Sequence, residues 1–529
     1  MDAPMYLKQN VQLEPLIDRW YAWPFLIAPA TAARCMTGRH LEIMDSYIRA
    51  PQLHAQAMRD PRMIGGPFID YDGKRVDEIL ALRNEMQRVR SHTIELSAAL
   101  FDLDRILRTK AKGFSLAPLY EEIPRILRGY VELVYDLNNN PSFKIIEPLL
   151  YNSHYYDRSS QSIMLSFTRG DERRYAFTTP RLEEKDAVHI HLPFDDEAAE
   201  KLFRLRYEPK PWEEINDILG LNNDQTEVFQ SFLTTEPPPK YIPYMGGGVR
   251  WRYFGHACIL IETKNASLLF DPILSYSYPS DIARFTYYDI PDSIDYVLIT
   301  HNHEDHVLFE TLLQIRSRVK NIVIPRNTTG SLQDPSLKLI LQNIGFSNII
   351  ELSDMESLQM DGVEITGIPF FGEHSDLDVK AKIAYAVRIG KYSFLVAADS
   401  CNLEPHLYEH VHRDLGDFDT LFIGMECDGA PMTWLYRPLL TQRLNREMDD
   451  SRRIVSSDFK QAIELVTRFN FREVYVYAMG QEPWLGHIRG SKLTPQSKPI
   501  MESNQLVEEC RRRGIVSERL FSRKEMALE

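Results

Sequence analysis

The stretch that decides the fold is IDYVLITHNHEDH, residues 294–306. Its first half is apolar and rich in β-branched residues, and it predicts a buried strand that ends at Thr300. Four side chains of types that bind metal ions follow at once: His301, His303, Asp305 and His306. Histidine and aspartate are costly to bury unless they are paired or bound to metal. The stretch therefore predicts a metal site just beyond the end of a strand.

The sequence around this stretch predicts a layered fold. Strand-like runs recur on both sides of it, among them VRWRYFGHACILIET (249–263), SLLFDPIL (267–274) and VYVYAM (474–479). Helical runs lie between the later strands, at 307–318, 337–345 and 459–469. Hairpins followed by strand–helix alternation favour a sandwich of two sheets with helices outside.

The N-terminal half has a different pattern. Apolar residues at helical spacing predict helices at 39–58, 76–109 and 130–151, and shorter β-like runs predict strands at 162–167 and 188–194. TTEPPPKYIPYMGGG (234–248) combines stiff proline with flexible glycine, which is typical of a linker. We therefore expect an α+β protein with two domains, a mixed α/β domain at 1–240 and the metal domain at 246–529.

Composition excludes several classes of protein. The 529 residues carry 61 Lys+Arg and 75 Asp+Glu, so the formal charge is 61 − 75 = −14, and 44 % are hydrophobic. That balance argues against a general nucleic-acid binder and against a disordered chain. The five cysteines form no CxxC pair, and neither a signal peptide nor a membrane-length apolar run is present. We expect a cytoplasmic protein that acts away from membranes and nucleic acid.

The HxHxDH pattern after such a strand resembles the metallo-β-lactamase superfamily, over about residues 246–500. That resemblance implies an αββα sandwich. YFGHACILIE (253–262) is similar to the superfamily's first hairpin, and LLFDP (268–272) to the strand that follows it. His256 and Asp271 in these segments either orient ligands or pack the hairpin.

The resemblance also implies further ligands. Asp399, at the end of YSFLVAADS, matches the bridging aspartate, and His487 is the candidate for the final histidine. The third position is open between Glu373 and His374 in GIPFFGEHSD. With Glu373 chosen, one metal has His301, His303, Glu373 and Asp399, and the other has Asp305, His306, Asp399 and His487.

Three carboxylates beside imidazoles suit iron or manganese better than an all-nitrogen set would. The pattern resembles one branch of the superfamily, the diiron β-hydroxylases of the chloramphenicol-biosynthesis type, in which a glutamate occupies the third position. WYAWPFLIAPATAARCMTGRHLEIM (20–44) also resembles that branch.

The resemblance to this branch implies a monooxygenase with two iron ions and O₂ as co-substrate. It would hydroxylate the β-carbon of an amino acid held as a thioester on an acidic carrier protein of a non-ribosomal peptide synthetase. It further implies an external electron donor, a homodimer formed through the N-terminal domain, and Glu373 as a catalytic ligand that changes its binding mode.

The sequence also allows another function and other roles for several residues. A binuclear zinc or manganese hydrolase of the same fold, acting on a phosphodiester, lactone or thioester, is the alternative function. Glu426, Asp428, Tyr477, Glu482 and Trp484 could line the pocket or simply pack loops. The pair His406 and His410 is more typical of a solvated helix face than of a metal site, and the arginine runs at 452–453 and 511–513 either dock an acidic carrier or are solvated.

Overall fold

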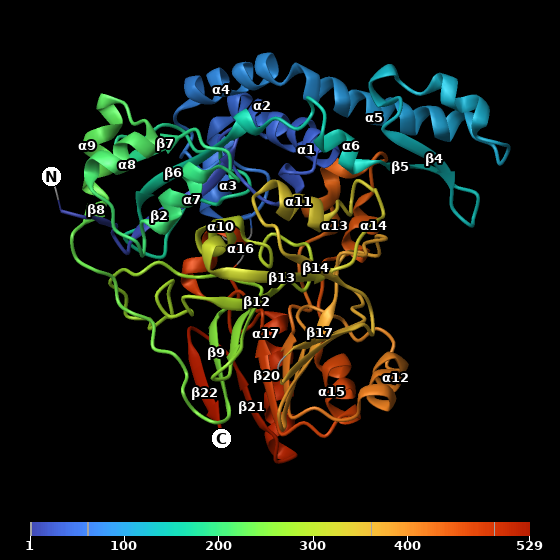
Figure 1. The fold of residues 1–529 in the computed structure, drawn as a ribbon. Helices are drawn as coiled ribbons and strands as arrows, with labels where there is room; N and C mark the ends of the chain where they lie inside the picture. The colour runs from blue at the N-terminus through green and yellow to red at the C-terminus, as the bar shows by residue number, and fades with distance from the viewer. Residues whose placement is uncertain (1–2, 61–62, 361, 491) are drawn as a thin grey trace.

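Two seven-stranded sheets stack face to face in the C-terminal half of the computed structural model, which describes residues 3–60, 63–360, 362–490 and 492–529. The first sheet has the order β14 (Ile349–Leu352), β13 (Val319–Pro325), β12 (Ile294–Leu298), β11 (Ser267–Phe270), β10 (Cys258–Glu262), β9 (Val249–Gly255) and β22 (Lys524–Leu528). The second has the order β15 (Ser357–Met360), β16 (Val363–Ile368), β17 (Ala384–Ile389), β18 (Tyr392–Val396), β19 (Thr420–Gly424), β20 (Glu473–Tyr477) and β21 (Val516–Arg519). The sheets occupy the lower half of Figure 1.

A core of aromatic and branched side chains fills the space between the two sheets. Trp251, Phe270, Tyr385 and Phe422 are buried there. The strands are covered on both faces, which explains why many of them read as continuous apolar runs. β10, CILIE, is buried along its whole length.

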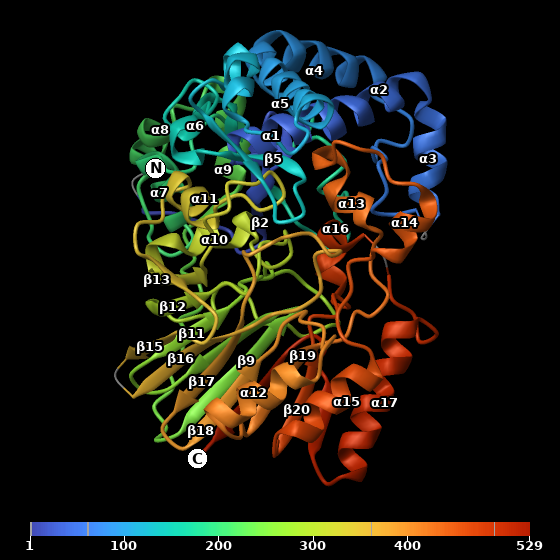
Figure 2. The same cartoon turned by 90° about the vertical axis from the view of Figure 1, so that its right-hand side faces the viewer.

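Helices cover the outer faces. α12 (His406–Leu415), α15 (Phe459–Arg468) and α17 (Lys498–Arg512) share a core with the second sheet and lie beside it at the foot of Figure 2. α10 (Phe309–Ile315) and α11 (Leu337–Asn343) pack on the outer face of the first sheet. The αββα sandwich preceded by a mixed N-terminal half is therefore confirmed.

The N-terminal half is built on a four-stranded sheet with the order β3 (Trp20–Tyr21), β2 (Val11–Ile17), β6 (Gln161–Phe167) and β7 (Ala187–Ile190). Around it lie α1 (Pro29–Cys35), α2 (Leu41–Arg49), α3 (Pro51–Arg59), α4 (Val76–Val89), α5 (Ser91–Lys110), α6 (Glu147–Tyr151), α7 (Glu197–Arg204), α8 (Trp212–Leu219) and α9 (Asn223–Ser231). Two small ladders join β1 (Tyr6–Leu7) to β8 (Leu233–Thr234) and β4 (Val131–Tyr135) to β5 (Pro141–Ile145).

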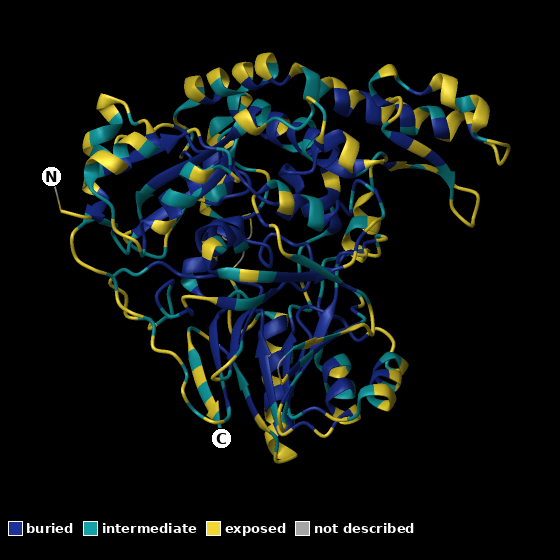
Figure 3. Cartoon of the chain, in the orientation of Figure 1, coloured by how far each residue is buried: buried dark blue, intermediate teal, exposed yellow. Residues whose placement is uncertain are grey.

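The two halves share one hydrophobic core. Trp20 and Tyr21 from the first half are in the same buried cluster as Leu260, Val297 and Leu312 from the second. Figure 3 shows this continuous burial where the halves meet, with exposed residues along the outer side of α4 and α5. Residues 235–248 form neither helix nor strand and connect the halves. The first sheet's outer face is thus covered by the N-terminal half as well as by α10 and α11.

Three N-terminal helix predictions need correction in detail. Residues 39–58 form two helices because Pro51 begins a new one, and 76–109 divide at Arg90. The helix predicted at 130–151 is wrong: residues 131–145 form the β4–β5 hairpin, and only α6 is helical. The turn sequence NNNP at 138–141 separates the two strands, and asparagine and proline favour turns over helix interiors.

No described helix is long and apolar enough to cross a bilayer.

Candidate metal centre

The loop after β12 is held in a compact turn by main-chain hydrogen bonds to the edge of the second sheet. The Ile383 N–H donates to the Thr300 carbonyl at 2.7 Å, and the Asn302 N–H donates to the Ala381 carbonyl at 3.1 Å. The Val307 N–H closes the turn on the His303 carbonyl at 2.9 Å. The four side chains of the motif, His301, His303, Asp305 and His306, are all buried. The loop therefore presents its ligands rigidly to the interior.

Three overlapping groups of side chains could each hold a metal ion. They are His301, His303 and Glu373; His301, His306 and Asp399; and His256, Asp305 and His306. In each group the candidate ligand atoms lie within 4.8 Å of one another, and every member is buried. The groups share His301 and His306, so they form one continuous centre with room for two ions.

Glu373 and His374 both lie against the ligand loop, but of the two only Glu373 belongs to one of the groups found in the described chain. Glu373 Oε1 lies 3.1 Å from His303 Nδ1, whereas His374 Nδ1 lies 2.8 Å from the Tyr436 hydroxyl. The same hydroxyl is 3.1 Å from His303 Nε2. Glu373 has a left-handed backbone, with φ 66°, which turns its side chain away from the direction that His374 takes. The two candidates for the third position thus have different roles, one at the centre and one in a hydrogen-bonded group around Tyr436.

Asp399 lies at the heart of the centre. It follows β18, and its Oδ2 is 2.9 Å from His306 Nε2. Glycine is required opposite it, because a Cβ on Gly424 would lie 2.4 Å from Asp399 Oδ1. The preceding residue, Ala398, has φ 47°, a conformation that costs free energy for any residue but glycine. The backbone is strained where it places this carboxylate.

Asp271 orients His306. Its Oδ2 lies 2.8 Å from His306 Nδ1, and its carboxylate also accepts the Thr300 N–H at 2.8 Å and the Thr300 hydroxyl at 2.7 Å. A carboxylate on one ring nitrogen fixes the tautomer and leaves the other nitrogen for a metal. Asp271 therefore directs His306 Nε2 into the centre.

The protonation behaviour of the centre reflects charges crowded together in a buried place. Burial, with His306 and His303 nearby, holds the pKa of His301 well below its ordinary value. Burial and the neighbouring Asp399 and Asp305 raise the pKa of Glu373 well above its ordinary value. Burial disfavours the charged form of His306, but Asp271 and Asp399 outweigh it and raise its pKa. Such opposed shifts are typical of functional sites.

The residues fit a pair of metal ions. His301 Nε2 and Asp399 Oδ1 are buried and find no hydrogen-bond partner among the described residues. Unpaired buried polar atoms are rare in folded proteins, and a bound cation would satisfy both. The set of imidazoles and carboxylates is one that iron, manganese and zinc all accept.

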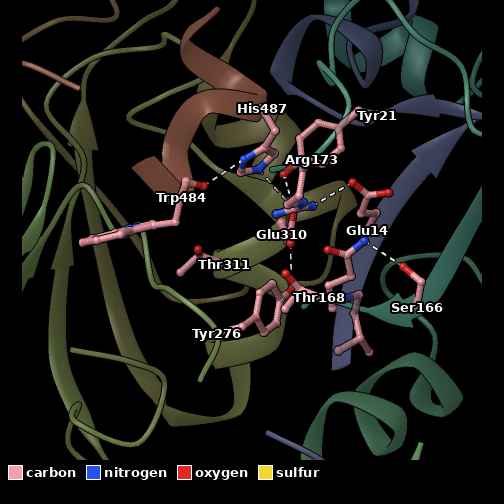
Figure 4. Close-up of polar contacts among 12 residues, drawn as sticks. Glu14, Tyr21, Ser166, Thr168, Arg173, Tyr276, Glu310, Thr311, Trp484 and His487 are labelled. Atoms are coloured by element: carbon pink, nitrogen blue, oxygen red, sulfur yellow. Dashed lines mark hydrogen bonds and ion pairs between the residues drawn. The ribbon is translucent and has the colours of Figure 1, made fainter. Parts of the chain in front are cut away.

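His487, the candidate for the final histidine, lies apart from the three groups found in the described chain. It lies on α16 (Gly486–Arg489) with Nδ1 3.1 Å from the Trp484 carbonyl and Nε2 4.0 Å from Glu310 Oε2. Figure 4 shows its ring beside Arg173 and Glu310. The short helix turns this side chain toward the N-terminal half, and it is His256 that lies in a group with Asp305 and His306.

The partners of His487 belong to a second buried polar cluster, the arginine network, made of Glu14, Arg173, Arg181 and Glu310. Arg173 bridges the two glutamates at 2.7 and 2.9 Å. Glu310 also accepts hydrogen bonds from the hydroxyls of Tyr21, at 2.5 Å, and Tyr276, at 2.7 Å (Figure 4). A cavity of about 20 Å³, lined by Arg173, Glu310 and His487 among others, adjoins it. The network joins β2 to α10, the helix that follows the ligand loop.

The other pocket candidates divide between structural and surface positions. Glu482 accepts the Tyr253 hydroxyl at 2.5 Å and the His256 N–H at 3.2 Å, and the Tyr477 hydroxyl accepts the Ala398 N–H at 3.1 Å. Glu482 and Tyr477 therefore support the backbone of the segments that carry candidate ligands.

Three further candidates lie near the surface or in the shared core. Asp428 pairs with Arg453 at 3.5 Å in a half-exposed position, and Trp484 packs in the shared core. His406 lies 2.6 Å from Glu404 on the surface.

Sequence reasoning missed Tyr436 and named His256 only as a residue that orients ligands or packs the hairpin. Tyr436, on α13 (Met432–Tyr436), touches His303 and His374 but lies about 60 to 130 residues from them in an unremarkable helix. His256 carried a signal, its place in a hairpin like that of the superfamily, and its positive φ of 48° marks it as a position held under strain.

Comparison with known proteins agrees with this geometry. A family model described as the diiron non-heme β-hydroxylase N-terminal domain matches residues 6–237, and a β-lactamase superfamily domain matches 250–426. The chain is 38 % identical over 529 residues, 99 % of each chain, to the 4-amino-L-phenylalanyl-[CmlP-peptidyl-carrier-protein] 3-hydroxylase of Streptomyces venezuelae.

Solved structures give the same result. The crystal structure of CmlA, a diiron β-hydroxylase from Streptomyces venezuelae, matches with a TM-score of 0.94 and 38 % identity, covering 100 % of both chains. A substitution variant of CmlA matches with a TM-score of 0.92, covering 99 % of this chain and 100 % of that one. Full-length similarity at this identity includes both halves and the segment between them. This chain therefore belongs to the diiron non-heme β-hydroxylases, oxygenase enzymes that work with two iron ions and O₂.

Proposed function

We propose that one iron ion is held by His301, His303, Glu373 and Asp399, and the other by His256, Asp305, His306 and Asp399. The observation that carries this assignment is the chain of three overlapping buried groups that share His301 and His306. Asp399 would serve both ions, since it lies 2.9 Å from His306 and 3.9 Å from His301. Glu373 remains the ligand that we expect to change its binding mode.

When bound, the two iron ions with O₂ supply the oxidising power that replaces a C–H bond by C–OH. The protein holds the ligands in a buried place that excludes bulk water, because every one of the proposed ligands is buried. Asp271 fixes the ring of His306, and Tyr436 links His303 to His374. Rigid placement of this kind is the protein's share of cofactor chemistry.

The substrate class follows from the relative. That protein's name describes an aminoacyl group held on a peptidyl carrier protein and hydroxylated at carbon 3, the β-carbon. We propose the same class for this enzyme: an amino acid tethered as a thioester to an acidic carrier protein. An external electron donor, a homodimer and a cytoplasmic location complete the proposal. The five cysteines are all free, which suits a reducing compartment.

The test begins with metal analysis of the purified full-length protein, followed by reduction and exposure to O₂ with an aminoacyl carrier protein. We expect about two iron ions per chain and a product whose acyl group has gained one oxygen atom, with none formed anaerobically. Carrier protein without a loaded amino acid is the control. Protein that retains zinc or manganese and hydrolyses the thioester without O₂ would favour the alternative, a hydrolase of the same fold.

A further inference from the structure

The helix α16 lies between the N-terminal half and the metal centre, and residues of the N-terminal half contact it. The Ala176 N–H donates to the His487 carbonyl at 2.7 Å. At the end of the helix, a Cβ on Gly490 would lie 2.9 Å from the Gly65 Cα and 3.2 Å from the Tyr175 ring. These contacts leave the helix little freedom to move. Any side chain that α16 directs to the metal centre is therefore firmly placed.

Arg489, on the last turn of α16, is that side chain. Its Nη1 donates to Asp305 Oδ2 at 2.6 Å, and its Nη2 donates to Glu426 Oε2. The Arg489 side chain is 14 % exposed, and the two carboxylates are 12 % and 18 % exposed. A guanidinium group is planar and offers its donors in a fixed fork, so these two contacts define its orientation.

The stem of Arg489 is held as well as its head. It crosses directly over Gly480, where a Cβ would lie 2.3 Å from Arg489 Nε and 2.8 Å from Cδ. Gly480 also has a φ of +56°, which side chains rarely adopt. Glycine at position 480 thus leaves space for the arginine stem, and a side chain there would fill that space.

We propose that Arg489 is a positioning residue that fixes the orientation of the Asp305 carboxylate toward the metal centre. The Asp305 oxygen that accepts the hydrogen bond from Arg489, Oδ2, also lies 3.1 Å from His256 Nε2, so the guanidinium group holds the carboxylate in the orientation that brings it beside another candidate ligand. Without the guanidinium group, Asp305 could rotate, and Glu426 would be left as a poorly solvated carboxylate without its cation. The proposal rests on the two-iron assignment made above. It adds that α16, which carries no proposed ligand, orients one through Arg489.

The experiment compares Mössbauer spectra of iron-loaded wild-type protein and the Arg489→Met variant. We expect about two iron ions per chain in both, with the signal of one iron shifted in the variant and the other unchanged. A fall to about one iron per chain, with one signal lost, supports the same role. Arg489→Lys keeps the charge but cannot contact both carboxylates, so we expect about two iron ions per chain and a shifted signal for one of them.

A second pair of variants tests the position of the arginine without changing the charge of the protein. Gly480→Ala displaces the arginine stem without changing any ionisable group, and we expect the same single shifted signal. Gly416→Ala is its control, because Gly416 also has a positive φ, of 73°, and meets no atom within 4 Å in the described chain. Identical spectra for wild type and Arg489→Met would overturn the proposal, as would loss of both irons from a folded variant. Wild-type protein without two irons would instead contradict the assigned metal centre.

Discussion

Two buried polar clusters of this molecule, the metal centre and the arginine network, are connected through α10 and α16 but differ in how their charges are satisfied. In the arginine network, both oxygens of Glu14 and both oxygens of Glu310 accept hydrogen bonds. Burial disfavours ionised Glu14, but Arg181 and Arg173 outweigh it and hold its pKa well below the ordinary value. In the metal centre, Asp399 Oδ1 and His301 Nε2 are unpaired among the described residues.

The backbone of the metal centre is also strained. Non-glycine residues with positive φ there include His256 (48°), Asp271 (37°), Glu373 (66°) and Ala398 (47°). Strain of this kind persists only where the surrounding structure enforces it, and it gathers at functional sites. The comparison teaches that burial and charge alone do not mark a binding site. In the metal centre the unpaired atoms belong to a carboxylate and an imidazole, which can bind a cation, whereas in the arginine network both glutamates are paired and the unpaired atom is Arg173 Nε, which cannot.

The largest effect is expected from removing the shared ligand. Asp399→Asn keeps the shape but removes the charge that both iron ions use, so we expect iron content to fall well below one per chain and hydroxylation to be undetectable. Metal analysis and product mass spectrometry measure this. His410→Ala, an exposed histidine near Arg413, is the control and should keep wild-type iron. Full iron content in Asp399→Asn would remove this residue from the ligand set.

His256 and His487 test the comparison further, because only His256 lies in one of the groups found in the described chain. His256→Ala is expected to lose one of the two irons, because it removes a ligand of the group with Asp305 and His306. His487→Gln is expected to keep both, since its ring lies beside the arginine network. Iron content and the Mössbauer spectrum separate the two variants. The opposite result would restore His487 as a ligand and contradict the fold of α16.

The arginine network should matter to stability. Arg173→Met leaves Glu14 and Glu310 short of a cation, and breaking a buried pair in this way costs about 3–5 kcal/mol in free energy of unfolding. Urea denaturation measures the loss. Arg204→Met, which removes the exposed pair with Glu208, should cost about 0.5 kcal/mol or less. Equal losses in the two variants would show that the network contributes no more than a surface pair.

A third kind of buried carboxylate, one with no cation beside it, gives the smallest and most gradual effect. Glu147 accepts the Ser336 N–H, and burial raises its pKa to about 7 from an unfolded value of 4.5. A raised carboxyl pKa stabilises the folded state fully below pH 4.5, and that contribution is lost as the pH rises to about 7. We expect about 3 kcal/mol of stability to be lost over this range.

Glu147→Gln should remove most of that dependence, and denaturation curves at several pH values compare the variant with wild type. Asp334, whose pKa burial raises to about 6, contributes in the same direction in both proteins. If the difference between wild type and variant stays constant from pH 4.5 to 7, the raised pKa of Glu147 is wrong.

The sequence by itself determined the centre of this protein. A β-branched run followed by HNHEDH predicts a strand and a ligand loop, because both signals are local. Asp399 could be found for the same reason, at the end of an apolar strand. The layered fold followed from the order of strands and helices. The failure at 131–145 had a local cause too, since an apolar pattern cannot by itself exclude a short hairpin.

The remaining residues of the proposed centre come together only in the tertiary structure. Glu373 was separated from His374 by a left-handed backbone, and His256 from His487 by the direction in which a four-residue helix faces. Tyr436 and Arg489 reach the ligands from elements far away in the chain. The physical reason is common to all four cases. A metal ion requires side chains at set distances in space, and pattern along a chain fixes such distances only between near neighbours.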